Sequence, residues 1–155
     1  MYNGLLHLHS LLRWVILLLL LIALVRHLAG MNNKRLVSNA DRKVDLFLMI
    51  AAHITFVIGL YQWIAGEKGL KTIQHFGMGE VMKNSGYRFF AVEHLAGMLL
   101  AVILITVGRG AVKRSSDWRI HKKAFWFFLV ALLLVIVSIP WPFREGIGRP
   151  WFPGM

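Results

Sequence analysis

Long runs of apolar residues alternate with short polar segments along this chain of 155 residues. Crossing a hydrocarbon core of roughly 30 Å takes about 20 helical residues, and four of the runs reach that length. In hydrocarbon every backbone N–H and C=O must be paired within its own segment, which favours helices, and the period-2 alternation of a membrane barrel is absent. The predicted spans are about 3–28, 44–65, 87–108 and 118–143.

These spans predict an all-α fold, a four-helix transmembrane up-down bundle that forms a single domain over residues 1–155. Capping side chains precede the second and fourth helices, in Asn39-Ala40-Asp41 and Ser115-Ser116-Asp117. Glycines predict an irregular stretch between the second and third spans, and prolines from Pro140 onward end the last helix. The first apolar run lacks a small-residue cleavage site, so we expect a retained helix rather than a signal peptide.

Basic residues predict the orientation of the bundle. The first loop holds five Lys and Arg residues and the third holds six, which together make 11 of the 18 in the chain. By the positive-inside rule these two loops face the cytoplasm and both termini face the periplasm. We therefore expect a multi-pass protein of the bacterial inner membrane.

Net charge and the absence of cysteine limit the partners and cofactors that the protein can have. The net charge is +11, but the basic residues adjoin apolar runs, so the lipid bilayer is the expected partner and no nucleic acid is expected. The chain has no Cys, which excludes disulfides, thiolate metal sites, iron–sulfur clusters and covalently attached c-type haem.

The candidate functional residues are ionisable groups inside the predicted spans, where charge is costly and commonly marks a site. At 1.5 Å per residue, His9 and His94 lie at nearly the same depth, about 9–12 Å from the outer helix ends, and His53 lies deeper, at about 18 Å. The first and third helices are diagonal neighbours in an up-down bundle, so His9 and His94 can face each other across the core. Two opposed imidazoles suit a six-coordinate b-type haem, with His53 as the alternative ligand.

Three further residues belong to this hypothesis. Arg13 lies one turn below His9 and could neutralise a haem propionate or pair with Glu93. Gly97 follows His94 by three residues and could leave room for a macrocycle, although close helix packing explains it equally well. We expect His75 and His121 to be solvated loop residues, and the roughly 9 Å difference in depth between His53 and His121 argues against a second haem.

Four segments carry a family resemblance. The chain resembles a family of small four-span proteins from Bacteroidetes-type bacteria that are commonly labelled "cytochrome B", and it is distantly similar to transmembrane b-type cytochromes and CopD-like proteins. The likeness covers nearly the whole chain and implies a haem b electron carrier in the inner membrane. The segments are 6–14, Ala52-His53, 87–94 and Ser138-Ile139-Pro140-Trp141-Pro142.

The sequence therefore predicts a b-type cytochrome with a non-covalent bis-His haem, an electron carrier or redox subunit rather than a stand-alone enzyme. A quinone is a second candidate cofactor, and a respiratory or redox protein is the expected partner. Two alternatives stay open at this point. One is a haem-free copper-handling or transport protein, and the other is a small accessory subunit of a respiratory complex.

Overall fold

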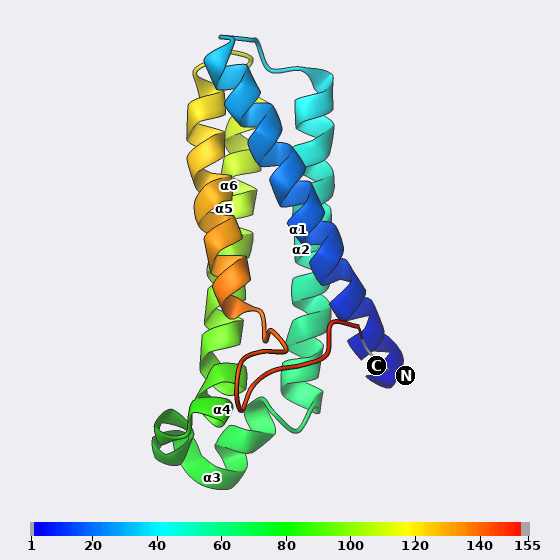
Figure 1. The fold of residues 1–155 in the computed structure, drawn as a ribbon, viewed down its shortest axis with the longest axis vertical. Coiled ribbons are helices and arrows are strands. Elements are labelled where there is room, and N and C mark those ends of the chain that lie inside the picture. The colour runs from blue at the N-terminus through cyan, green and yellow to red at the C-terminus, as the bar shows by residue number, and fades with distance from the viewer. Residues whose placement is uncertain (1, 153–155) are drawn as a thin grey trace.

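Four long apolar helices form the body of the protein, as the hydrophobic pattern predicts. The computed structural model describes residues 2–152 and contains no strand within that range. The third long helix is continuous in space but has three parts, because a short α-turn and a π-helical turn lead into it (Figure 1). The elements are α1 Tyr2–Asn32, α2 Asn39–Ala65, α3 Leu70–Lys83, α4 Ser85–Arg88, the π-helix η1 Phe89–Glu93, α5 His94–Arg114 and α6 Ile120–Ser138.

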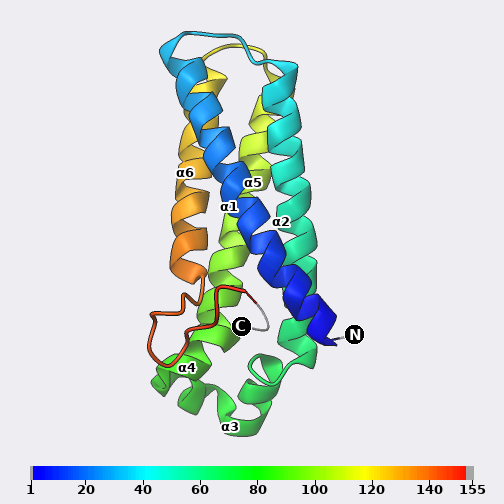
Figure 2. The same cartoon turned by 45° about the vertical axis from the view of Figure 1, so that its right-hand side comes forward.

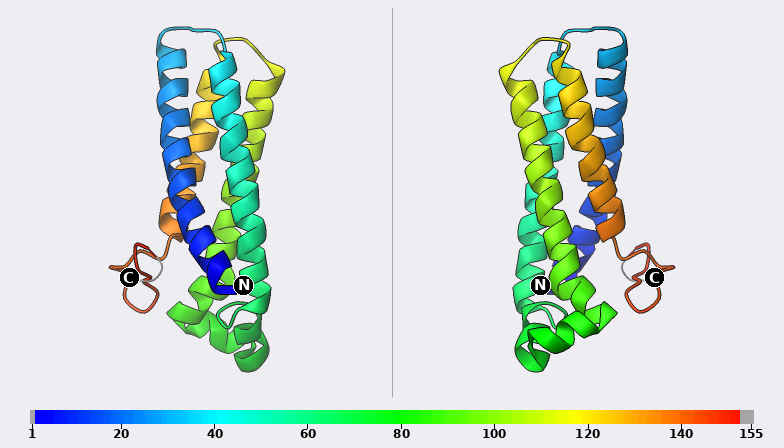
Figure 3. Two further views of the ribbon diagram at one scale, coloured as in Figure 1. Left: turned by 90° about the vertical axis from the view of Figure 1, so that its right-hand side faces the viewer. Right: turned by 90° about the vertical axis from the view of Figure 1, so that its left-hand side faces the viewer.

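The long helices pack as an antiparallel up-down bundle. α1 contacts α2 and α6, and α5 contacts the same two helices, so α1 and α5 lie on one diagonal and α2 and α6 on the other. α1 is inclined to the other three, as Figures 1 and 2 show. The start of α1 and the segment after α6 lie at one end, called here the termini end, and the α1–α2 and α5–α6 loops lie at the loop end (Figure 3).

The outward faces of these helices are apolar, which identifies a multi-pass membrane protein. Each of the four long helices is long and apolar enough to cross a bilayer. Within their most apolar windows only 17% to 33% of the residues are buried inside the bundle. The remaining apolar side chains, such as Leu18, Val57 and Val137, face outward and are 60%, 65% and 69% exposed. Lipid is the environment that such a surface requires.

Two predictions about the helices are wrong. The fourth span was expected to reach Phe143, but α6 ends at Ser138, because Ile139 is extended and Pro140 has no N–H to continue the helix. The stretch between the second and third spans was expected to be irregular, but it contains α3. This helix bends at Gly77, where φ is 76°, a left-handed conformation that glycine adopts without strain.

Candidate functional site

His9 and His94 meet at the termini end of the bundle, as their predicted depths require. Their ring centres lie 6.3 Å apart and the ring planes form an angle of 64°. His94 is the first residue of α5 and directly follows the π-helical turn η1. Such turns widen the helix by one residue and are frequent at functional sites. Both imidazoles are partly buried.

The two rings are held differently. His94 Nδ1 donates a hydrogen bond of 2.6 Å to the main-chain oxygen of Ser138 at the end of α6. This bond fixes its tautomer and leaves Nε2 as an acceptor or metal ligand. His9 Nδ1 is buried and makes no hydrogen bond of good geometry among residues 2–152, and the main chain of Thr55 on α2 lies near the ring. The His9 ring lies over Gly59 of α2, where a Cβ atom would stand only 2.9 Å from Cε1, so a larger residue there would displace it.

Cationic and aromatic groups surround this pair. Arg13 donates a hydrogen bond of 2.7 Å to the main-chain oxygen of Trp151, and its Nε is buried with no partner in the described part of the chain. Arg149 lies near enough to interact electrostatically with both His9 and His94. Its position depends on the fold of the segment after α6, so sequence reasoning missed it.

Two of the predicted site residues, His53 and Glu93, do not join the pair. His53 is exposed on the outer face of α2 and its Nδ1 donates to the oxygen of Met49 at 2.8 Å, so it does not join His9 or His94. Its depth was suitable, but its direction around the helix was not. Glu93 is also exposed, and its carboxylate pairs with Arg88 at 2.6 Å.

A direct pair with Glu93, one of the two roles that the sequence left open for Arg13, is therefore wrong, because Arg13 binds the Trp151 main chain and Glu93 binds Arg88. Gly97 packs against α6, where a Cβ atom would collide with the Ser138 hydroxyl. Its small size serves helix contact in this structure, which was the second of the two explanations that the sequence left open.

A second histidine pair lies at the loop end. His27 and His121 are fully buried, and their Nδ1 atoms lie 2.8 Å apart. Asp45 is also buried, and its carboxyl group is hydrogen-bonded to His27 Nε2 at 3.1 Å. The expectation that His121 is a solvated loop residue is wrong, because the first turn of α6 turns it into the bundle against Gly30, away from the neighbouring lysines.

The positions of His27 and Asp45 on their helices explain why both are buried, but the stripes on which they lie are as apolar as the rest of each helix and the sequence pattern does not single them out. His27 follows the buried residues Leu20, Ala23 and Leu24 at helical spacing on one stripe of α1. Asp45 likewise lies on the stripe of α2 that holds Leu48 and Ala52. The sequence analysis gave no role to His27 or to Asp45.

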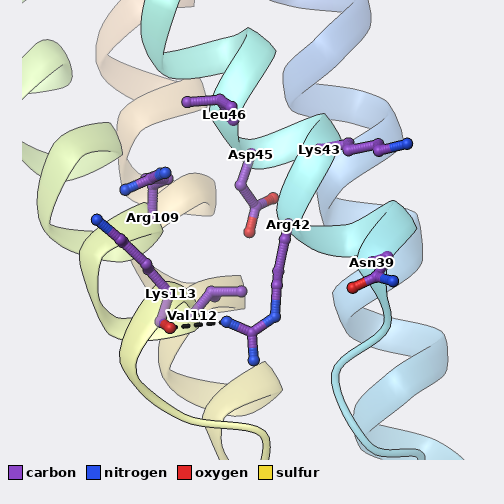
Figure 4. A pocket seen from close by; sticks show the side chains of 8 residues that line it. All are labelled: Asn39, Arg42, Lys43, Asp45, Leu46, Arg109, Val112 and Lys113. Carbon is purple, nitrogen blue, oxygen red and sulfur yellow. Dashed lines mark hydrogen bonds between the residues drawn. The ribbon is translucent and has the colours of Figure 1, made fainter.

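A buried carboxylate and a basic pocket complete the loop end. Asp41 is fully buried and accepts from Arg26 at 2.9 Å and Arg35 at 2.7 Å. The hydrogen bond to Asp41 raises the pKa of Arg35 above its ordinary value. Between α2 and α5 lies a pocket of about 200 Å³, shown in Figure 4. Its lining residues are Asn39, Arg42, Lys43, Asp45, Leu46, Arg109, Val112 and Lys113.

The two histidine pairs differ in what they can hold. A metal ion bonded to two imidazoles at about 2 Å each separates the ring centres by about 6 Å once the ring radii are added. The 6.3 Å between His9 and His94 matches that spacing. The 2.8 Å between the His27 and His121 nitrogens leaves room only for a hydrogen.

Comparisons of the chain with protein-family models, with curated proteins and with solved structures find no match.

Proposed function

We propose that this protein is a b-type cytochrome of the bacterial inner membrane that binds haem b non-covalently between His9 and His94. The observation that carries the proposal is the spacing of 6.3 Å between two imidazoles from diagonal helices.

The surrounding residues suit the proposed cofactor. The Ser138 carbonyl oxygen orients the His94 ring and increases its basicity as a ligand. Arg13 and Arg149 are the cations that would balance the haem carboxylates in a medium of low dielectric constant. Bound haem would supply a one-electron redox couple, and the protein would supply ligands, orientation and exclusion of water.

The proposal also includes a direction across the membrane. The loops at the loop end carry most of the basic residues, so they face the cytoplasm and the His9–His94 pair lies in the periplasmic half. Electrons would pass between a quinol or a redox partner protein and an acceptor near the periplasmic face. The proposed role is that of an electron carrier or redox subunit.

An absorption spectrum of the full chain purified from haem-replete cells tests this function. The reduced protein should show the sharp α-band of low-spin bis-His haem, and acidified acetone should extract the pigment because no covalent bond holds it. His94→Ala and His9→Ala should each abolish the low-spin band. His53→Ala is the matched control and should leave the spectrum unchanged, since His53 points outward.

Two results would contradict the proposal. The first is a colourless wild-type protein whose circular dichroism shows the expected helix content. The second is a spectrum that survives loss of His9 and His94 but changes with His53→Ala. If a colourless protein retained copper through these histidines, the metal-handling alternative would replace the cytochrome.

A further inference from the structure

Asp45, His27 and His121 form a continuous hydrogen-bonded chain in the interior of the loop end. The Asp45 carboxyl group meets His27 Nε2 at 3.1 Å and 3.2 Å. His27 Nδ1 meets His121 Nδ1 at 2.8 Å, and His121 Nε2 meets the main-chain oxygen of Arg35 at 3.0 Å. All four ring nitrogens are therefore engaged, and the three side chains are at most 1% exposed.

The hydrogens that the three hydrogen bonds between Asp45, His27, His121 and the Arg35 carbonyl oxygen require can be counted. Each of its three links needs one hydrogen, and the last must reside on His121 Nε2 because the Arg35 carbonyl oxygen only accepts. Two neutral imidazoles carry two hydrogens between them. With Asp45 ionised, one link would therefore lack a hydrogen and leave two lone pairs facing each other. The contacts are complete only with a third proton.

The third proton also balances the charge. With three protons the cluster is neutral, either as an ionised Asp45 beside one imidazolium or as a carboxylic acid beside two neutral rings. Removing one leaves a buried negative charge, and adding one places two N–H groups against each other across 2.8 Å. Asp41, four residues before Asp45, pairs with Arg26 and Arg35 and is not part of the hydrogen-bonded cluster.

We propose that Asp45, His27 and His121 form a buried site that binds one exchangeable proton. The proton has three positions: the Asp45 oxygen, His27, and His121. A transfer from Asp45 to His27 Nε2 leaves the carboxylate, and the Nδ1 proton of His27 then passes to His121 Nδ1. Protons and charge are conserved at each step, and no heavy atom has to move far.

The pocket between α2 and α5 is the entrance to this site. Asp45 is one of the residues that line the pocket, so it is the member of the cluster that lies next to the pocket (Figure 4). The charged residues around the entrance are Arg42 and Lys43 on α2 and Arg109 and Lys113 on α5. Arg42 donates a hydrogen bond of 2.7 Å to the main-chain oxygen of Lys113. Asp45 is the acidic residue among those that line the pocket.

The hydrogen-bonded series does not continue beyond the Arg35 carbonyl oxygen, so a proton cannot leave at that end. The Arg35 carbonyl oxygen accepts a hydrogen bond but does not take up a proton at ordinary pH. A proton that enters through Asp45 therefore leaves through Asp45, and the site stores a proton on the loop side rather than conducting it across the bilayer. His9 lies about 27 Å away along α1, so this inference is independent of the proposed haem.

A proton count on the full chain tests the proposal. In protein labelled with ¹⁵N-histidine and reconstituted in nanodiscs at pH 7.5, ring-nitrogen shifts report each N–H, and an infrared carboxylic-acid band reports a proton on Asp45. The wild type should hold three protons, with a coupling across the shared hydrogen between the two Nδ1 atoms. Asp45→Asn should hold two on the histidines, because its amide donates the missing hydrogen to His27 Nε2.

Asp117→Asn is the control, since Asp117 is exposed in the α5–α6 loop and should leave the count at three. A wild-type count of two would overturn the proposal. So would independent titration of His27 and His121 in the wild type. Both measurements need only the wild-type protein, so they decide the question even if Asp45→Asn fails to fold.

Discussion

Arg13 of α1 donates a hydrogen bond of 2.7 Å to the main-chain oxygen of Trp151, far along the chain. Trp14 stacks on the Trp151 ring at 6.0 Å beside it, so the segment after α6 is attached to α1 by adjacent residues. The bond has a direct consequence for Glu93, the carboxylate that sequence reasoning assigned to Arg13. Glu93 pairs with Arg88 instead, at 2.6 Å.

The effects of Arg13→Leu and Glu93→Leu should therefore be additive. Residues without shared partners add within about 0.5 kcal/mol, whereas loss of one member of a shared buried pair would cost about 3–5 kcal/mol. A double-mutant cycle on unfolding by SDS in mixed micelles measures this. A coupling energy above about 1 kcal/mol would mean that the two residues interact, directly or through a bound group.

Gly30→Ala should disrupt the loop end. A Cβ atom at Gly30 would lie 2.5 Å from His121 Nε2 and 2.6 Å from two ring carbons, so the His121 ring would have to leave its place between His27 and the Arg35 carbonyl. Overpacking of this kind costs about 1–3 kcal/mol. Gly4→Ala in the same helix meets no atom within 4 Å and should be neutral or stabilise by up to about 1 kcal/mol. Thermal unfolding of the two variants in one detergent compares them, and equal melting temperatures would contradict the prediction.

Asp41→Ala should be strongly destabilising. Asp41 is fully buried, accepts from two arginines, and forms a capping box with Ser38 at the start of α2. We expect a loss of about 3 kcal/mol, the lower end for a broken buried ion pair, because Arg26 and Arg35 are 33% and 37% exposed and can reach water. Glu145→Ala is the control, because Glu145 is exposed, and it should cost less than about 0.5 kcal/mol. Similar losses in chemical unfolding of both variants would show that the Asp41 contacts contribute little.

The positive-inside rule predicts the orientation. Alkaline phosphatase is active only in the periplasm, so a fusion after Met155 should be active and a fusion within the 33–38 loop inactive. Green fluorescent protein at the same two positions should give the opposite pattern. The reverse result in both assays would place the proposed haem on the cytoplasmic side and the proton site on the periplasmic side.

The sequence alone determined the number, order and class of the four long apolar helices, because backbone pairing in hydrocarbon is settled within each segment. It also placed His9 and His94 at one depth, since depth follows from counting residues along a helix. The end of α6 near Pro140 was visible in outline, but the five-residue error at Phe143 reflects the extended Ile139 before it.

Only the tertiary structure decided which way each polar side chain points. In a soluble helix the apolar stripe marks the buried face, but a helix in lipid is apolar on both faces, so its rotation cannot be read from periodicity. His53 and His27 illustrate this. His53 was a candidate ligand but faces outward, whereas His27 was given no role and is fully buried. The partners of Arg13, Glu93 and His121 come from segments distant in the chain or from a local turn, and packing between helices selects them.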